Sequence, residues 1–374
     1  MSVDQSSEFN PLKLDFCKNL FIAAGLCRIA GTNPGEFGLG HGEENTLKFD
    51  RNAVLSLNQE QMVMAISAVL FVLFSIFLDG FFRISNLLSL LQSVSILGIL
   101  AIGMAVVVIG RGIDLTMVAV MVFSTGWSFT LFSGGMQVET ALLLGLLLAV
   151  AFGAVNGFLI AYVEIPAIFA TLAMATVISG LGRFALVSSE NIFISGDVGW
   201  FASLGTGALA AVPMPVLLFL IISCLAFVAL RLTRYGAFVY AIGDNPLASR
   251  NSGMSIRPMT VLMYSFASLV AFCAGLIMAM TVSSVNTKLA SSTMIYDIIL
   301  VVVIGGIGLA GGKGSIRNVI SGTVLIGLLL NGLTIMNVDY SAQNIIKSLI
   351  LLLAIIVDSL LNPRDEQTSQ QGDI

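Results

Sequence analysis

The chain has 374 residues, of which 57% are hydrophobic and 10% are charged, with a formal net charge of −4 and a mean hydropathy of +0.99. Surface helices of soluble proteins alternate apolar and polar faces, whereas several runs here are apolar on every side. One histidine, His41, and four cysteines without a C-x-x-C pair leave little for a zinc site or a Ser-His-Asp triad. The composition predicts a polytopic protein of the lipid bilayer, and we expect no cofactor, no nucleic-acid partner and no enzymatic activity.

Residues 1–55 differ from the rest, because they are rich in Gly, Pro, Ser, Asn and Glu and contain one short apolar run, Leu20–Leu26. That run is too short to cross a hydrocarbon layer, which takes ~20 residues. We expect 1–55 to be a poorly ordered cytoplasmic extension, 56–362 the transmembrane domain, and 363–374 a short cytoplasmic tail. An initiation codon placed too early is an alternative explanation of the extension.

From residue 61 onward, ten apolar runs each approach the length of a membrane-spanning helix. They are 61–82, 87–110, 113–133, 141–163, 165–188, 214–231, 258–284, 294–312, 315–337 and 342–361. Glycines and polar residues interrupt the edges of the third and the eighth run. The sequence therefore predicts an all-α fold, a transmembrane bundle of about ten spanning helices.

The distribution of Lys and Arg predicts the orientation of this bundle. The loops on the N-terminal side contain Lys48, Arg51, Arg111, Arg231, Arg234, Arg250, Arg257, Lys313, Arg317 and Arg364. The opposite side has the shorter set Arg83, Arg183, Lys288 and Lys347. Because cytoplasmic loops are enriched in Lys and Arg, we expect both termini in the cytoplasm.

Two short patterns recur in the two halves of the chain. Val106–Gly110 recurs as Val301–Gly305, and Asn156 with the glycine after it is echoed by Asn331 with its glycine. Related halves are common in transporters, but short apolar strings also recur by chance. Internal duplication and chance recurrence both remain open.

The segment Gly306–Ser315 contains G-x-G-x-x-G and nearly matches a phosphate-binding P-loop. A dinucleotide fingerprint needs a preceding strand in a βαβ unit, and this segment instead ends an apolar span. Ile307 replaces the first P-loop glycine, and Gly314 replaces the Ser or Thr that would hold magnesium. We therefore favour a glycine-rich helix break that allows close helix packing, and we expect that the chain does not hydrolyse ATP itself.

Polar residues within the spans or at their edges are the candidates for a solute path. A charged group at membrane depth costs at least ~2.5 kcal/mol on insertion scales, and hydrocarbon offers polar groups no hydrogen-bond partner. An interfacial position or a helix cap is the plainer alternative for the acidic residues, and hydrogen bonding between helices is the plainer alternative for the asparagines. The candidates are Asp114, Thr116, Asn156, Thr171, Asp297 and Asn331.

The loop after the sixth span combines basic charge with helix-capping residues. Asn245 can cap a short helix that has Pro246 at its first position, and Gly253 can end it. A loop that only fixes topology would not need a capped helix of defined length, so we expect this loop to dock a soluble partner. The residues assigned to docking are Arg234, Tyr240, Asp244, Asn245, Ala248, Arg250, Ser252 and Gly253.

This loop and several other motifs make the chain similar to a known family. They resemble the sugar permeases of the ribose/xylose/arabinose type in ATP-binding cassette (ABC) importers, in the segments Thr233–Gly236, Tyr240–Gly243, Asn245–Gly253, Gly112–Leu115, Asn156–Gly157, Pro166, Phe169–Leu172, Val303–Gly306, Gly311–Ser315 and Asn331–Gly332. The resemblance covers about residues 60–362. The chain departs from the family pattern at Thr116–Ala119, where a Ser and a glycine are usual, and at Leu247, where an acidic residue is common.

The resemblance implies a permease for a neutral sugar or polyol in the bacterial inner membrane. It also implies three protein partners: a cytoplasmic ABC ATPase subunit, a periplasmic solute-binding protein, and a second permease copy in a homodimer or pseudo-dimer. A permease for branched-chain amino acids is a more distant alternative. An ion-coupled secondary carrier would need more intramembrane carboxylates or histidines than Asp114 and Asp297, and a membrane-embedded enzyme would need His, Asp or Glu clustered near one membrane face.

Overall fold

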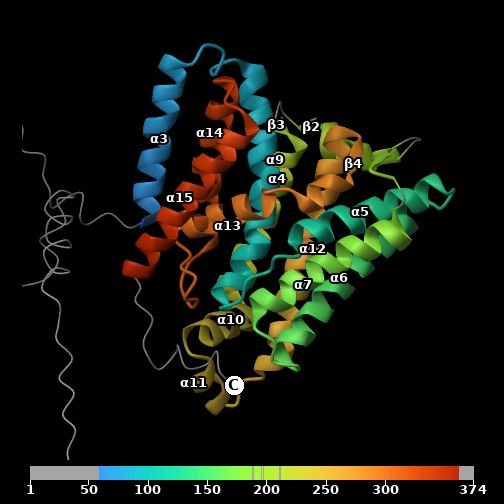
Figure 1. The fold of residues 1–374 in the computed structure, drawn as a ribbon, viewed down its shortest axis with the longest axis vertical. Coiled ribbons are helices and arrows are strands. Elements are labelled where there is room, and N and C mark those ends of the chain that lie inside the picture. Colours follow the sequence, from blue (N-terminus) through green and yellow to red (C-terminus); the bar gives the residue numbers. More distant parts are fainter. Residues whose placement is uncertain (1–58, 188, 195, 197, 210–211, 362–374) are drawn as a thin grey trace, which may run out of the picture. The chain divides into compact units, whose positions relative to one another are not determined.

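The computed structural model describes residues 59–361 except 188, 195, 197 and 210–211. The extension expected at 1–55 and the tail expected at 363–374 lie outside the described residues. Between them, apolar helices follow the ten predicted spans in chain order (Figure 1). The prediction of an all-α polytopic fold is confirmed.

Among the described residues, seven helices are long and apolar enough to cross a membrane. They are α3 (Gln59–Phe77), α4 (Ile84–Ile109), α6 (Val138–Ala161), α7 (Ala167–Leu181, continued by a π-helical turn to Leu186), α9 (Met214–Leu232), α12 (Ile256–Val282) and α14 (Ile316–Ile335). Three shorter apolar stretches lie in α5 (Met117–Ser133), α13 (Met294–Gly305) and α15 (Tyr340–Leu361, apolar over Tyr340–Ile356).

Short elements occupy the connections between these helices. α10 (Arg234–Asp244) and α11 (Pro246–Asn251) lie between α9 and α12. β1 (Asn191–Phe193) pairs antiparallel with β4 (Ser284–Asn286), with Ile192 opposite Val285, and β2 (Ala208–Leu209) pairs with β3 (Val212–Pro213). The remaining turns of helix are Gly199–Ala202, α8 (Ser203–Thr206) and Thr287–Ser291.

The third and eighth spans are shorter than the sequence predicted. α5 begins at Met117 because residues 112–116 are irregular, after a left-handed Arg111 with φ of 70°. α13 ends at Gly305, because Gly306, Gly311, Gly312 and Gly314 all have positive φ values that residues with a side chain rarely adopt. The glycine-rich segment is thus a loop, as the helix-break interpretation expected.

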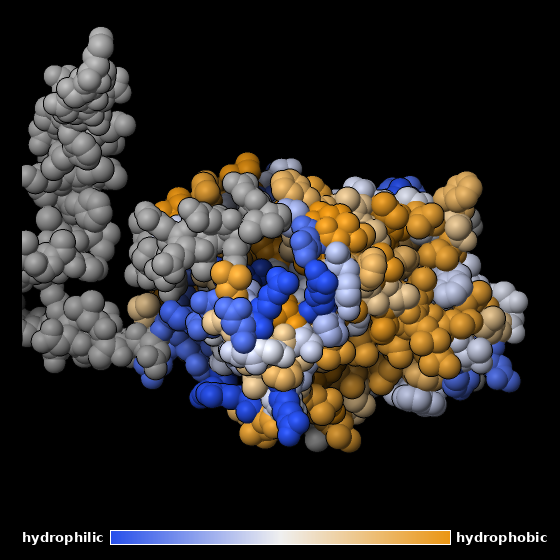
Figure 2. All heavy atoms as spheres, turned by 90° about the horizontal axis from the view of Figure 1, so that it is seen from below, coloured by the Kyte–Doolittle hydropathy of each residue, from blue (hydrophilic) through white to orange (hydrophobic). Residues whose placement is uncertain are grey.

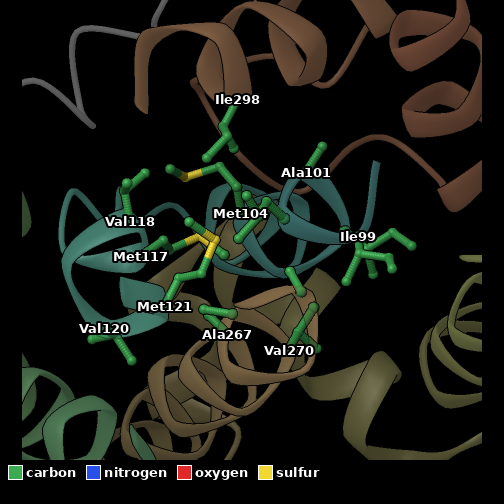
Figure 3. Packing of buried hydrophobic residues seen from close by; sticks show 14 of the residues in the cluster. Ile99, Ala101, Met104, Met117, Val118, Val120, Met121, Ala267, Val270 and Ile298 are labelled. Atoms are coloured by element: carbon green, nitrogen blue, oxygen red, sulfur yellow. The ribbon is translucent and has the colours of Figure 1, made fainter. Parts of the chain in front are cut away.

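The helix α4 lies at the centre of the bundle. Of its most apolar 18 residues, 83% are buried inside the protein, whereas 11% of the corresponding residues of α3 are buried. α4 packs against α9, α12, α13 and α14. Figure 3 shows Met104 of α4 near Met117 and Met121 of α5, with Ala267 of α12 beside them. Helices α9, α12, α13 and α14 therefore surround α4, and the apolar outer faces of α3, α6, α7, α9 and α15 are left for lipid or a partner.

The two ends of the bundle differ in chemistry. α10, α11, the C-terminal end of α4 and the loop 306–315 lie together at the lower end in Figure 1, which we call the α11 end. Figure 2 views the molecule from this end and shows hydrophilic residues gathered there beside broad hydrophobic surfaces. The α3–α4 turn, the α14–α15 turn and the β1–β4 pair lie at the opposite end.

Helices α6 and α12 approach each other closely at two glycines. A Cβ atom on Gly153 would lie 2.5 Å from the carbonyl oxygen of Tyr264 and 2.8 Å from the Cα of Ser265, and a Cβ atom on Gly157 would overlap the backbone of Val261. Backbone atoms cannot rotate out of the way, so only glycine allows this contact, which is typical of membrane helices. The contact also holds Asn156, between the two glycines, fully buried.

We predict that Gly157→Val destabilises the folded protein by about 1–3 kcal/mol, because it forces α6 and α12 apart. Thermal unfolding of the purified chain in detergent measures the effect. Gly180→Val on α7 is the matched control, since nothing lies within 4 Å of a Cβ atom there. Equal stability of the Gly157 and Gly180 variants would contradict the packing argument.

Candidate functional site

The helix α11 is the capped helix that the sequence predicted. The side-chain oxygen of Asn245 accepts a hydrogen bond from the Ala248 backbone nitrogen at 2.9 Å, and Pro246 occupies the first helical turn. Gly253 follows the helix with a φ of 79°. The cap satisfies one of the free N–H groups at the helix start, and the left-handed glycine ends the helix.

The residues assigned to docking gather at the α11 end, and most of them face outward. Exposed members are Arg234, Asp244, Asn245, Ala248, Arg250, Ser252 and Gly253. Leu247, which also lies on α11, leaves 53% of its surface exposed. The α11 surface therefore combines an apolar side chain with basic groups, a composition suited to insertion into a groove on another protein.

Tyr240 differs from the other docking candidates because it is half-buried and faces the bundle. Its hydroxyl donates a hydrogen bond to the Gly314 carbonyl at 2.8 Å. Burial raises the pKa of Tyr240 above its ordinary value, so the hydroxyl keeps its proton at neutral pH. Tyr240 thus joins α10 to the glycine-rich loop, and its part in docking stays a prediction.

Backbone contacts hold α10 against the end of α4. The Gly312 nitrogen donates a hydrogen bond to the Ile109 carbonyl at 2.8 Å. Gly243 of α10 lies against both groups, because a Cβ atom there would be 2.5 Å from the Gly312 nitrogen and would overlap the Ile109 carbonyl oxygen. We call Ile109, Tyr240, Gly243, Gly312 and Gly314 the α4–α10 junction.

The helix α11 is in turn attached to α10. The hydroxyl of Ser249, a buried α11 residue, donates a hydrogen bond to the Ala241 carbonyl at 2.8 Å. Hydrogen bonds and close contacts therefore connect α11 to α4 through α10 and the α4–α10 junction.

Three of the candidates for the solute path are hydrogen-bonded to one another just beyond α4. An oxygen of Asp114, Oδ1, accepts from the Thr116 backbone nitrogen at 2.9 Å and from the Thr116 hydroxyl. The Asn156 side-chain amide donates to the Thr116 hydroxyl oxygen at 2.8 Å. All three side chains are fully buried, and the short turn at Asp114 is one that aspartate side chains commonly form before a helix.

Thr171 and Tyr264 complete this group, which we call the Asp114 cluster. The Thr171 hydroxyl lies 3.2 Å and the Tyr264 hydroxyl 3.4 Å from the Ile113 carbonyl oxygen. The second oxygen of Asp114 and the side-chain oxygen of Asn156 have no hydrogen-bond partner among the described residues. Because an unsatisfied buried acceptor is costly, both oxygens are available to a hydrogen-bond donor.

Asp297 lies apart from this cluster and is paired with Lys347 of α15. The Lys347 Nζ atom is 2.9 Å and 3.0 Å from the two carboxylate oxygens, and the side chains are only 9% and 13% exposed for Lys347 and Asp297. The sequence analysis counted Lys347 with the loops, whereas the structure places it two turns inside α15. Its charge is tolerated there because Asp297 balances it.

Asn331 belongs to a third group. Its side-chain amide donates to the Asn86 oxygen at 2.9 Å, and the Asn86 amide donates back at 3.1 Å. These bonds connect α14 to the first turns of α4 at the end opposite α11. The structure thus places the six path candidates in three groups, and their part in solute passage stays a prediction.

Sequence reasoning missed Tyr264, Lys347 and Asn86. Lys347 and Asn86 contact candidates that are distant along the chain, and Tyr264 contacts the Ile113 carbonyl next to Asp114. The available signal was a polar residue within or beside an apolar run. Within the residues that the structure describes, no group of three or more His, Cys, Asp or Glu side chains is placed to hold a metal ion.

We predict that Asn156→Leu destabilises the folded chain by about 1–3 kcal/mol, because it removes the donor to Thr116 and places an apolar side chain among buried polar groups. Thermal unfolding in detergent tests this. Val155→Leu, at the exposed neighbouring position on α6, is the control and should match the wild type. An Asn156→Leu protein as stable as this control would contradict the structural importance of the cluster.

Comparison with known proteins gives a consistent assignment. The family model described as the branched-chain amino acid transport system permease component matches residues 86–357. The ribose import permease of Escherichia coli strain K12 is 33% identical over 301 residues, covering 80% of this chain and 94% of that protein. The fructose import permease of Rhizobium meliloti is 30% identical, covering 76% of this chain and 81% of that protein. No solved structure matches this chain.

The family match runs from the start of α4 into α15, and so includes α10, α11, the α4–α10 junction and the Asp114 cluster. The family consists of transport permeases, and membership implies an ATPase and a substrate-binding protein as partners and an inner-membrane location. The chain therefore belongs to this family and is the membrane permease subunit of an ABC importer.

Proposed function

We propose that the chain moves a neutral sugar or polyol across the bacterial inner membrane, with energy supplied by a separate ATPase subunit. The observation that supports this best is the exposed, capped helix α11. Hydrogen bonds and close backbone contacts connect it, through α10, to the central helix α4. The relatives named above are import permeases for ribose and fructose, and a galactofuranose transporter permease of Escherichia coli is 30% identical over 274 residues.

The ATPase would dock on the exposed face of α11. Leu247 would enter an apolar depression on the ATPase, and Arg234 and Arg250 would meet acidic residues at its rim. Movement of the ATPase on nucleotide binding would then displace α11 and α10 together. The α4–α10 junction would pass this displacement to α4, because the contacts among Ile109, Gly243 and Gly312 are between backbone atoms, which side-chain rotation cannot relax.

The Asp114 cluster is placed to respond to such a displacement. It begins a few residues after the last turn of α4, and its hydrogen bonds join the segment before α5 to α6, α7 and α12. We assign Asp114, Thr116, Asn156 and Thr171 to a gate whose bonds exchange with solute hydroxyl groups as α4 moves. Asp297 and Asn331 would contribute polar groups to the path at the opposite end.

An uncharged cargo suits the balance of charge in the described spans. Asp297 and Lys347 neutralise each other, so Asp114 is the one charged group left among the six path candidates, and none of the six offers a cation to a solute carboxylate. A branched-chain amino acid would instead need one cationic group for its carboxylate and a separate anionic group for its ammonium. We therefore favour a sugar or polyol over an amino acid.

The remaining partners follow from the orientation that the Lys and Arg distribution supports. Both termini and the α11 end would face the cytoplasm. The periplasmic solute-binding protein would dock at the opposite end, near the β1–β4 pair. A second copy of the permease in a homodimer would complete the path, which the three separate groups of candidates would then line together.

We predict that Ala248→Asp and Gly253→Val reduce the affinity of the chain for its ATPase by about tenfold, because the first places an uncompensated charge in the docking surface and the second blocks the turn that ends α11. Co-purification and sugar-stimulated ATP hydrolysis in proteoliposomes are the measurements. Ala202→Asp introduces the same charge on an exposed helical turn at the opposite end and should leave ATPase binding unchanged.

Two outcomes would count against this proposal. Unchanged ATPase binding in both α11 variants would remove α11 as the docking site. Failure of the complete wild-type complex to accumulate radiolabelled ribose, fructose or another monosaccharide on addition of ATP would contradict the proposed function itself.

A further inference from the structure

A polar hollow of about 470 Å³ lies at the α11 end of the bundle, where the end of α6, the last turn of α11 and the start of α12 meet. We call it the Arg257 hollow. Its volume falls within the ~300–1,000 Å³ that is typical of pockets for small molecules. Its polar lining consists of Tyr162, Glu164, Arg250, Ser255 and Arg257.

The charged side chains of the hollow favour an anion. Two arginines and one glutamate line it, so their charges sum to one positive charge. The Arg257 Nη2 atom donates a hydrogen bond to Glu164 Oε1 at 2.9 Å, and both side chains are about half exposed. Among the residues that the structure describes, Arg250 has no ion-pair partner. The hollow therefore offers a guanidinium group that no carboxylate of the described chain neutralises.

Glu164 adopts a backbone conformation that is unfavourable for a residue with a side chain. Its φ of 63° lies in the left-handed region, where glycine or asparagine usually ends a helix. The Ile165 nitrogen donates to the Leu159 carbonyl at 3.2 Å and closes this turn after α6. Such strain is common where function requires a particular side chain. The side chain gained here is a carboxylate that occupies the position at Arg257 that an incoming anion would need.

An apolar surface continues from the hollow along the outside of the bundle. The exposed rings of Phe158 and Tyr162 on α6 stack with their centres 5.1 Å apart. The guanidinium carbon of Arg257 lies 5.6 Å from the centre of the Tyr162 ring. Further exposed apolar side chains along α6 and α12 are Leu147, Val155 and Leu262. A molecule bound here would meet guanidinium groups at one end and apolar side chains at the other.

Two simpler roles explain only parts of this arrangement. An ion pair that fastens α6 to α12 would need Glu164 and Arg257 alone, and exposed ion pairs contribute little to stability. That role does not account for Arg250 in the same hollow, or for a glutamate where glycine would relieve the strain. A soluble phosphate compound would account for both arginines, but not for the apolar surface beside them.

We propose that the Arg257 hollow binds the phosphate group of an anionic phospholipid, whose acyl chains lie along the exposed apolar face of α6. Arg250 and Arg257 donate hydrogen bonds to the phosphate oxygens, which the planar guanidinium group can contact in pairs. The phosphate replaces the Glu164 carboxylate as the partner of Arg257. This site goes beyond the proposed transport function. The orientation proposed above would place it at the cytoplasmic leaflet, where anionic lipids attract basic groups.

Arg250 connects this site to the docking surface. It lies in the last turn of α11, so a bound lipid joins α11 to the ends of α6 and α12. The guanidinium group has five N–H donors, which are enough for a phosphate group and for an acidic residue of the ATPase. The lipid thus adds a second attachment of α11 to the bundle, beside the hydrogen bond from Ser249 to α10.

Native mass spectrometry of the full chain in detergent, titrated with dioleoylphosphatidylglycerol, tests the proposal. We expect Arg257→Gln to raise the dissociation constant about tenfold, the size of change that loss of a hydrogen bond to a charged group produces. Arg250→Gln should also weaken binding, and it breaks no ion pair among the described residues. Arg317→Gln is the matched control, because Arg317 is exposed at the start of α14 and does not line the hollow.

Glu164→Gln separates a lipid site from a purely structural ion pair. We expect this variant to bind the lipid several-fold more tightly, because the competing carboxylate is gone, while Arg257→Gln binds it more weakly. A structural pair would instead give both variants the same change, since each breaks the same contact. Weaker binding by Glu164→Gln would overturn the proposal, as would equal dissociation constants for the Arg250, Arg257 and Arg317 variants.

Two further ligands identify the source of the phosphate group. Dioleoylphosphatidylcholine, which is zwitterionic, should bind more weakly than the anionic lipid, because its choline group meets the arginines. Glycerol 3-phosphate, which has a phosphate group but no acyl chains, should not displace the lipid at equal concentration. Displacement by glycerol 3-phosphate would assign the hollow to a soluble phosphate compound and overturn the proposal. None of these measurements needs the ATPase or a sugar, so their outcome is independent of the proposed transport function.

Discussion

The contact of the Ile109 carbonyl with the Gly312 nitrogen and with Gly243 is the constraint on which the rest of the structure depends. Three parts of the chain meet there: the end of the central helix α4, the helix α10 that supports the exposed α11, and the loop that follows α13. Each approaches as closely as backbone atoms allow, which requires glycine at two of the three positions. This contact joins α10, and with it α11, directly to the end of α4.

The helix α4 connects that contact to polar groups at both ends of the bundle. Its buried length leads to the hydrogen bonds between Asn86 and Asn331 at one end and, just beyond its other end, to the Asp114 cluster. α13 also packs against α4, and its Asp297 pairs with Lys347 of α15. In the proposed mechanism, a displacement of α4 would reach the polar groups assigned to the solute path, so that a soluble ATPase could act on a site it does not touch.

Local sequence signals predicted the parts of this structure that depend on neighbouring residues. Hydropathy located the apolar helices, and the Asn245, Pro246 and Gly253 pattern located α11 with both of its ends. The predicted third and eighth spans are longer than the helices α5 and α13. Hydropathy contains no information on backbone conformation, and Arg111 and Gly306 adopt left-handed φ values. The partners of the candidate residues could not be predicted, since Lys347 lies 50 residues from Asp297 and Asn86 lies 245 residues from Asn331. Such pairs are set by the packing of whole helices, which a single sequence does not specify.

The most direct test of the account is the number of sugar molecules transported per ATP hydrolysed by a complex containing Gly243→Ala. An added methyl group at Gly243 meets the Ile109 carbonyl and the Gly312 nitrogen, so it separates α10 from α4 while leaving the exposed α11 surface unchanged. We expect normal membrane insertion, normal ATPase binding and continued ATP hydrolysis, with a several-fold fall in sugar transported per ATP. A transport ratio equal to that of the wild type, in a variant that still binds its ATPase, would contradict the claim that the α4–α10 junction couples the ATPase to the solute path.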